Sequence, residues 1–191
     1  MLSGALIFLV ETAFGLFVVA LLLRFYLQWA RAPLRNPLSE FLRALTDFMV
    51  RPARRIVPGL WGLDLATFAL AWIVQLLELV IVLHLRGYQP GAEAGLAFAV
   101  LVALALVALV RLGLYIVMAA VIIQVVLSWL GPYSPLAPLV NSLTRPFLRL
   151  FQKRIPPVGN VDLSPLFLLV VIQLLLMLPV AWAEVSLTRL L

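Results

Sequence analysis

Four long apolar segments constrain this 191-residue chain more than any other feature. They cover residues 5–29, 65–85, 92–130 and 163–183. A helix needs about 20 residues to cross a hydrocarbon core of about 30 Å, and every segment is at least that long. Since 65% of the residues are hydrophobic and only 12% are charged, a soluble fold of this size could not bury the apolar surface. The sequence therefore predicts an all-α, polytopic membrane protein with four transmembrane helices.

An internal repeat organises these segments. Residues that recur 98 positions later include Thr46, Arg51, Asp64 and Gln75, which return as Thr144, Arg149, Asp162 and Gln173. Upstream, at a shift of 100, Trp29 returns as Trp129. We therefore expect a first unit at residues 1–90 and a second at residues 105–191, with residues 91–104 as a linker and a helical extension at the outer interface. Each unit comprises a transmembrane helix, an amphipathic interfacial helix followed by a basic stretch, an Asp, and another transmembrane helix.

The basic residues predict the orientation of both units. Ten of the 14 Lys and Arg residues lie in the two polar loops. The first loop has six Arg against three acidic residues, and the second has four basic residues against one Asp. Cytoplasmic loops retain positive charge, so we expect both basic loops in the cytoplasm and both termini outside. The same clustering argues against nucleic acid as a partner.

The third apolar segment is longer than one crossing requires. Residues 92–130 would form a helix of about 58 Å, almost twice the thickness of the hydrocarbon core. Two crossings with a break near Arg111 and Gly113 would explain the length, but they would place the second basic loop outside. The positive charges of that loop therefore favour one long or bent helix.

Each polar loop contains an amphipathic segment. In residues 38–49 apolar side chains fall at helical spacing with polar side chains opposite, and residues 136–147 repeat the pattern. Such a helix lies in the membrane interface, where each following basic residue would gain about 1 kcal/mol from anionic head groups. The alternatives are a docking face for a cytoplasmic protein and a sensor of membrane tension. The basic residues concerned are Arg51, Arg54, Arg55, Arg149, Lys153 and Arg154.

An Asp precedes the second apolar helix of each unit. Asp64 and Asp162 are expected to cap these helices, because a carboxylate there accepts hydrogen bonds from free backbone N–H groups. Arg24 suggests a second role, since it lies in the last turns of the first helix near the level of Asp64. It could pair with either Asp and tie the units together, or extend alone to the membrane surface.

The loop residues form a recognisable pattern in both units. The first unit contains Trp29, Asn36, Pro37, Thr46, Pro52, Arg54, Arg55, Ile56, Pro58, Gly62 and Asp64. The second contains Ser128, Trp129, Thr144, Arg145, Pro146, Lys153, Pro156, Gly159, Asp162, Leu163, Ser164 and Pro165. The pattern resembles that of the YggT family, a bacterial and plastid group of small membrane proteins with one or two such units. Three positions depart from the family pattern: Phe48 and Leu150 replace prolines, and Gln152 replaces one of the paired arginines.

The resemblance covers nearly the whole chain, and it implies a multi-pass protein of the bacterial inner membrane. It also implies a link to osmotic-stress tolerance and, in some lineages, to cell division or thylakoid biogenesis. We therefore expect a protein that supports osmotic-stress tolerance or envelope and cell-division processes through its cytoplasmic interfacial loops.

Three charged residues fall inside the predicted transmembrane helices, where each costs about 2.5–3.5 kcal/mol unless it faces a partner or water. They are Glu11, Glu78 and Arg111. At the shift of 100, Glu11 aligns with Arg111, so a pseudo-twofold packing of the units would pair opposite charges. Such a network would either fasten the helices or line an ion pathway between the units. The latter describes an ion channel or transporter subunit that also uses Arg24 and Gln124.

The sequence lacks the residue types and motifs that are typical of metal sites and of enzyme active sites. The chain has no Cys and one His, and it shows no phosphate-binding loop, paired catalytic carboxylates or nucleophile elbow. We therefore expect a non-enzymatic protein without a cofactor. The expected partners are a bilayer with anionic head groups and a membrane or cytoplasmic protein. A homo-oligomer stays open, because Ala99 and Ala103 on the third helix give only a weak packing signal.

Overall fold

The computed structural model describes residues 2–33, 36–59, 62–88, 94–130, 136–154 and 162–191. The helices are α1 (Leu2–Trp29), α2 (Pro37–Ile56), α3 (Leu65–Leu85), α4 (Ala94–Leu130), α5 (Ala137–Gln152), α6 (Ser164–Leu175), the π-helical turn η1 (Leu176–Val180) and α7 (Ala181–Thr188). Four spans are long and apolar enough to cross a membrane, namely α1, α3, α4 and the continuous rod α6–η1–α7. No strand occurs within the described ranges, so the expected all-α, polytopic membrane fold is confirmed. Pro156, Gly159 and residues 91–93 lie outside the described residues.

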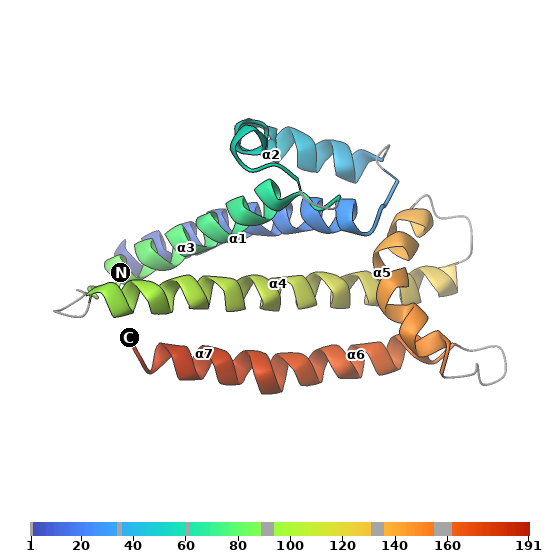
Figure 1. Ribbon diagram of the computed structural model, residues 1–191. Coiled ribbons are helices and arrows are strands. Elements are labelled where there is room, and N and C mark those ends of the chain that lie inside the picture. The colour runs from blue at the N-terminus through green and yellow to red at the C-terminus, as the bar shows by residue number, and fades with distance from the viewer. Residues whose placement is uncertain (1, 34–35, 60–61, 89–93, 131–135, 155–161) are drawn as a thin grey trace.

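The spanning helices are arranged around α4. Figure 1 shows α1 and α3 paired on one side of α4, and α6 and α7 on its other side. Helix α2 packs against α1 and α3, whereas α5 packs against α4 and α6. Both chain termini lie at the end of the bundle opposite α5 (Figure 1). We call the end at which α1 and α4 finish the loop end, and the opposite end the terminal end.

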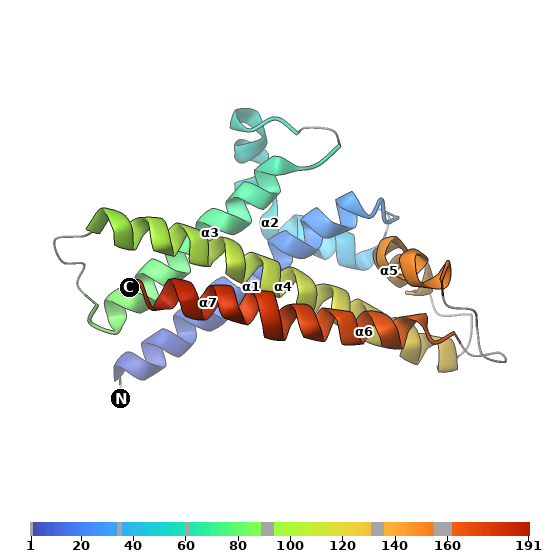
Figure 2. The same ribbon diagram turned by 60° about the horizontal axis from the view of Figure 1, so that its bottom comes forward.

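The long third segment forms one helix. Helix α4 has 37 residues, which correspond to about 55 Å, and it continues through Arg111 and Gly113. Two crossings would need a break there, so the expectation of a single long helix is confirmed. Residues 94–104, expected as a helical extension, form its first turns. Figure 2 shows that α4 crosses α1 and α3 at an angle and is therefore inclined relative to them.

Local sequence signals set the helix boundaries. Asn36 caps α2, because its side-chain oxygen accepts a hydrogen bond of 2.8 Å from the backbone N of Ser39. Gly87, just past the end of α3, adopts a φ of 82°, the left-handed conformation that favours glycine. Pro179 lacks an N–H for the carbonyl four residues earlier, and the π-helical turn η1 accommodates the lost bond.

The hydrophobic core joins the two units. One buried cluster combines Tyr26 of α1 with Val121 of α4, Leu143 of α5 and Ile172 of α6. A second cluster belongs mainly to the first unit but includes Leu109 of α4. The Tyr26 hydroxyl also donates a hydrogen bond to the backbone carbonyl of Leu143. This bond lies inside the shared core and links α1 directly to α5.

Tyr26→Phe should lower the melting temperature of the purified protein in detergent. The change leaves a buried carbonyl of Leu143 without this donor, which costs about 1–3 kcal/mol. For a chain of this size each kcal/mol corresponds to about 2–4 °C. Tyr115→Phe is the matched control, because Tyr115 is exposed on α4. Thermal melts followed by circular dichroism measure both, and an unchanged melting temperature for Tyr26→Phe would contradict the proposed link.

Candidate functional site

Arg24 is a buried cation on α1 whose partners lie on α2. Its Nη1 donates hydrogen bonds of 2.7 Å to Thr46 Oγ1 and 2.8 Å to Asp47 Oδ1. Asp47 also pairs with Arg51, one turn along α2, at 2.7 Å. The network therefore holds the amphipathic helix against the first spanning helix near the loop end.

This network corrects one expectation from the sequence. Arg24 pairs with Asp47, and not with Asp64 or Asp162 as the sequence had suggested. The reason is the position of α2, which packs against α1 so that Asp47, in its middle turns, lies beside Arg24. Arg24 therefore fastens elements within the first unit and does not join the two units.

Asp64 stands at the start of α3 and binds two kinds of donor. It is the N-cap residue, since it accepts hydrogen bonds from the backbone N of Thr67 at 3.3 Å and from the Thr67 hydroxyl. It also forms an ion pair with Arg54 of α2, whose Nη2 and Nε lie 2.5 and 3.2 Å from Oδ2. The Asp64 side chain is only 3% exposed. The pair thus connects the end of α2 to the start of a spanning helix.

The second unit repeats this contact without the positive charge. The N-cap position of α6 is occupied by Leu163, so Asp162, expected as the cap, lies one residue before it. Asp162 still accepts a hydrogen bond of 2.9 Å from the backbone N of Ser164 and another of 2.9 Å from Gln152 Nε2. Gln152 lies 98 positions after Arg54, and Asp162 lies 98 positions after Asp64. The two contacts therefore occupy equivalent places, one as an ion pair and one as a neutral hydrogen bond.

Two other pairs of equivalent positions at the loop end can be compared: one is unchanged, and the other loses its charge in the second unit. Thr46 and Thr144 are both fully buried and donate to the backbone carbonyl four residues earlier. Gln124 takes the place of Arg24 at the shift of 100. The Oε1 atom of Gln124 is buried and has no hydrogen-bond partner among the described residues.

The three aspartates of the loop end have pKa values below the ordinary value of a carboxyl group. Burial alone would raise the pKa of Asp47, but Arg24 and Arg51 hold this pKa below its ordinary value. Burial likewise opposes Arg54 and Thr67 at Asp64, and the net effect again lowers the pKa. At Asp162 the hydrogen bonds from Ser164 and Gln152 outweigh burial and lower the pKa.

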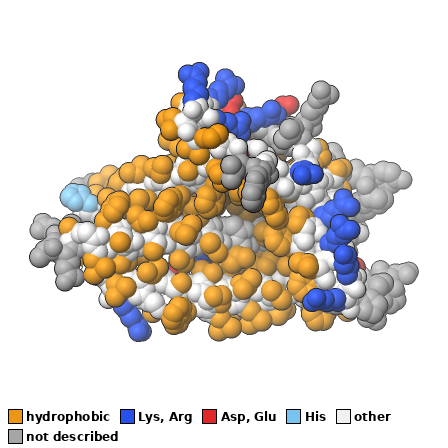
Figure 3. Space-filling model, viewed as in Figure 1, with side chains coloured by type: hydrophobic (Ala, Val, Ile, Leu, Met, Phe, Trp, Pro, Cys, Tyr) orange, Lys and Arg blue, Asp and Glu red, His pale blue; other side chains and the backbone are white. Residues whose placement is uncertain are grey.

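All six basic residues expected at the membrane surface are exposed. Figure 3 shows Lys and Arg side chains over α2 and beside α5, and mainly hydrophobic side chains over the other visible helices, with further basic atoms at the lower left near the terminal end. Of the six predicted residues, Arg51 and Arg54 also form the ion pairs with Asp47 and Asp64. The four others are Arg55, Arg149, Lys153 and Arg154.

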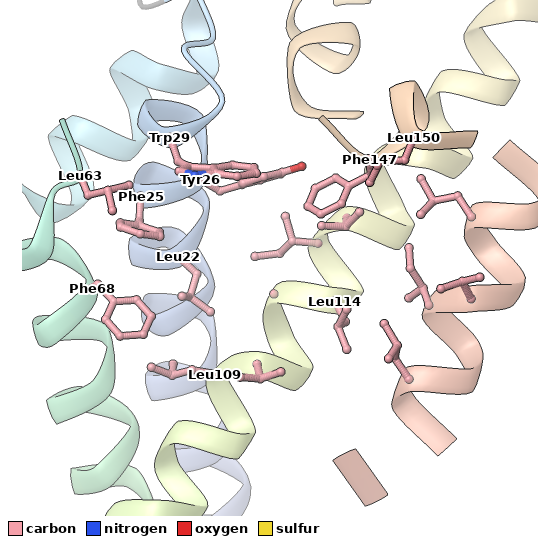
Figure 4. Close-up of a pocket in the computed structure, with 18 of the residues that line it drawn as sticks. Leu22, Phe25, Tyr26, Trp29, Leu63, Phe68, Leu109, Leu114, Phe147 and Leu150 are labelled. Carbon is pink, nitrogen blue, oxygen red and sulfur yellow. The ribbon is translucent and has the colours of Figure 1, made fainter. Parts of the chain in front are cut away.

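An apolar cavity of about 550 Å³ lies between the two units near the loop end. Figure 4 shows Leu22 and Phe68 of the first unit on one side and Leu114 and Phe147 of the second on the other. Aromatic rings from both units meet here, since the ring centroids of Trp29 and Phe147 are 5.9 Å apart. No charged side chain lines the cavity among the described residues.

The charges predicted inside the membrane form separate contacts. Glu11 pairs with Arg86 at 3.2 Å, and Arg111 pairs with Glu184 at 2.9 Å. Glu78 accepts a hydrogen bond of 3.0 Å from Gln75. The expected pair of Glu11 with Arg111 is therefore not formed, because Arg86, at the end of α3, pairs with Glu11 and Glu184 of α7 pairs with Arg111. Within the described ranges, no three His, Asp or Glu side chains gather as a metal site would require.

Sequence reasoning missed Asp47, Arg86 and Glu184 as partners. Glu184 was missed because the fourth apolar segment was ended at residue 183, whereas the helical rod continues to Thr188. The spacing of Asp47 and Arg51, one helical turn apart, was a usable signal for that pair. The pairing of Arg24 with Asp47 depends on how α2 packs against α1, and the residue pattern does not predict this packing.

The pKa directions predict how stability depends on pH. Asp47, Asp64 and Asp162 have lowered pKa values in the folded state, so below about pH 4 the unfolded chain binds more protons. The stability they contribute is therefore present above about pH 4 and is lost as the pH falls further. Melting temperatures in detergent between about pH 3 and 7 should show this fall. Asp47→Asn combined with Asp64→Asn should be less stable at neutral pH and show a shallower fall, and an equally steep fall would contradict the assignment.

Comparison with known proteins follows the same two-unit division. The CCB3/YggT family model matches residues 3–85 and again residues 103–183. No solved structure matches the chain.

Several bacterial proteins are similar to the chain over most of their length. An uncharacterised protein of Pseudomonas aeruginosa is 39% identical over 179 residues, which cover 93% of this chain and 89% of that protein. An uncharacterised protein of Vibrio alginolyticus is 31% identical, covering 87% of this chain and 88% of the relative. The uncharacterised protein YggT of Escherichia coli strain K12 is 27% identical, covering 90% and 87%. With two matched units and relatives matched nearly from end to end, the chain belongs to the CCB3/YggT family.

Proposed function

We propose that this is a non-enzymatic protein of the bacterial inner membrane whose loop end faces the cytoplasm and binds anionic head groups or a cytoplasmic partner. In this role it supports osmotic-stress tolerance or envelope and cell-division processes. The observation that carries the proposal is the paired attachment of α2 and α5. Arg54 with Asp64, and Gln152 with Asp162, join each amphipathic helix to the spanning helix that follows it.

The charge distribution supports the orientation. The exposed basic residues follow the amphipathic helices in both units, and basic residues are retained on the cytoplasmic side of bacterial membranes. Each gains about 1 kcal/mol near an anionic surface. A protein with both basic stretches on one face would therefore be held there by several kcal/mol of electrostatic attraction.

The attachment also suggests how the protein would respond to osmotic stress. Swelling changes the packing of lipids around an interfacial helix. Because Asp64 and Asp162 sit at the first turns of α3 and α6, movement of α2 or α5 would act directly on spanning helices. The shared apolar cavity between the units lies beside these turns and leaves space for such movement.

The alternative is an ion channel or transporter subunit that uses the intramembrane charges. It draws on Arg111 with Glu184, and on Glu78, which lies within electrostatic range of Glu11 and Arg111. The apolar lining of the cavity between the units favours the first proposal, since an ion pathway needs polar groups along its length.

Survival of a deletion strain after osmotic shock distinguishes the two. Arg55→Gln with Lys153→Gln and Arg154→Gln should fail to restore survival, because these exposed charges face the head groups. Arg111→Gln with Glu184→Gln should restore it, since that pair would serve only to fasten α4 to α7. The same residues changed to other basic ones (Arg55→Lys, Lys153→Arg, Arg154→Lys) form the matched control and should restore survival.

Ion flux in proteoliposomes under an osmotic gradient completes the test. The proposed function predicts no flux above that of empty liposomes, with folded protein verified by circular dichroism. Flux that disappears in Arg111→Gln with Glu184→Gln, together with full rescue by the loop-neutralised variant, would replace the proposal with the channel alternative.

A further inference from the structure

A second pocket lies between α1 and α2 in the first unit, near the loop end. Its volume is about 340 Å³. Arg24, Arg43 and Arg54 line it, together with the polar side chains of Gln28 and Ser39 and with two leucines. No acidic side chain belongs to this lining among the described residues. We call it the cationic pocket.

Contacts behind the pocket hold its arginines in place. Arg24 is buried and uses only Nη1 for its two bonds to α2, and Arg54 uses Nε and Nη2 for Asp64. The Nε of Arg43 donates to a backbone carbonyl of α2 at 3.2 Å. A guanidinium carries five N–H donors in a fixed plane, so Arg24 and Arg54 keep donors for a further acceptor.

Positive charge exceeds negative charge around the pocket. The arginines of this region are Arg24, Arg43, Arg51 and Arg54, and its carboxylates are Glu40, Asp47 and Asp64. Arg24 is buried and shares its carboxylate partner Asp47 with Arg51, so a bound anion would offset part of the cost of burying the Arg24 charge. The excess of charge therefore points to an anionic ligand.

The second unit shows that the fold does not require these charges. At the positions of the three arginines it carries Gln124, Asn141 and Gln152. Gln152 still bonds to Asp162, in the place of the Arg54–Asp64 pair. Neutral side chains are thus compatible with the fold of the unit at all three positions. Arg24 and Arg54 therefore attach α2 with charged groups where neutral ones suffice in the second unit, and this points to a further role for the positive charges.

We propose that the cationic pocket binds a phosphate group through Arg24, Arg43 and Arg54. Guanidinium groups donate paired, charge-assisted hydrogen bonds to phosphate oxygens, and Ser39 and Gln28 add neutral donors. A pocket between an amphipathic and a spanning helix opens at the depth of lipid head groups. We therefore favour the phosphodiester of an anionic glycerophospholipid over free phosphate. The site deepens the function proposed above and rests on it for its position at the membrane surface.

The test compares two variants that each lose three positive charges. Arg24→Gln, Arg43→Asn and Arg54→Gln together give the pocket the residues of the second unit. Arg31→Gln, Arg145→Gln and Arg189→Gln together remove three exposed charges outside the lining and serve as the control. Each protein, in neutral detergent, is titrated with short-chain phosphatidylglycerol, short-chain phosphatidylcholine or inorganic phosphate. Native mass spectrometry reports the bound species, and thermal melts report stabilisation.

Wild type and the control should bind one phosphatidylglycerol more tightly than phosphatidylcholine, and the pocket variant should lose at least about tenfold in affinity. Binding of inorganic phosphate alone, lost in the pocket variant, would keep the phosphate site and identify free phosphate as its source. Retained binding in the pocket variant, or an equal loss in both variants, would overturn the proposal.

A single substitution guards against a folding failure of the triple variant. Arg43 is exposed on α2, so Arg43→Asn should fold and still weaken phosphatidylglycerol binding by about tenfold. Unchanged binding in this folded variant would overturn the site. The osmotic rescue test depends on Arg55, Lys153 and Arg154, which do not line the pocket. A failed titration would therefore overturn the pocket and leave the result of the rescue test unaffected.

Discussion

The contact between Asp64 and Arg54 is the interaction on which the loop end of this protein depends. A carboxylate that is almost fully buried at the start of a spanning helix requires donors, and Arg54 and Thr67 supply them. The contact fixes the end of α2 beside α3, and the pairing of Arg24 with Asp47 then fixes the middle of α2 beside α1. The two ion pairs thereby add to the packing of Leu42 and Val50 in the hydrophobic core and make the amphipathic helix part of the folded bundle.

The two units preserve this geometry but distribute charge differently. Gln152 replaces Arg54, Gln124 replaces Arg24, and the hydrogen bond to Asp162 survives the change. The repeat thus gives two copies of the same helix attachment. The first unit has Arg24, Arg43 and Arg54 at positions where the second has Gln124, Asn141 and Gln152. The proposed common function therefore rests on the shared attachment, and the proposed phosphate site belongs to the first unit.

The sequence predicted the features that depend on segment length and local chemistry. Apolar segments located the four spans, the 98-residue repeat located the units, and the Asp before each second helix marked its start. It could not predict partners set by packing. Aligning Glu11 with Arg111 assumed symmetric units, whereas Arg86 and Glu184 approach from α3 and α7. The apolar cavity and the cationic pocket likewise depend on helix crossing, which residue patterns do not fix.

The parallel arrangement of the units, with α2 and α5 on the cytoplasmic face, is tested most directly by labelling single cysteines. The chain has no native cysteine, so Ala44→Cys on α2, Asn141→Cys on α5 and Thr188→Cys at the terminal end can each be read without background. A membrane-impermeant maleimide should label Thr188→Cys in intact cells and label the two loop-end positions only in inverted membranes. Labelling of Ala44→Cys and Asn141→Cys from opposite sides would contradict parallel units, and labelling of both in intact cells would contradict the cytoplasmic orientation.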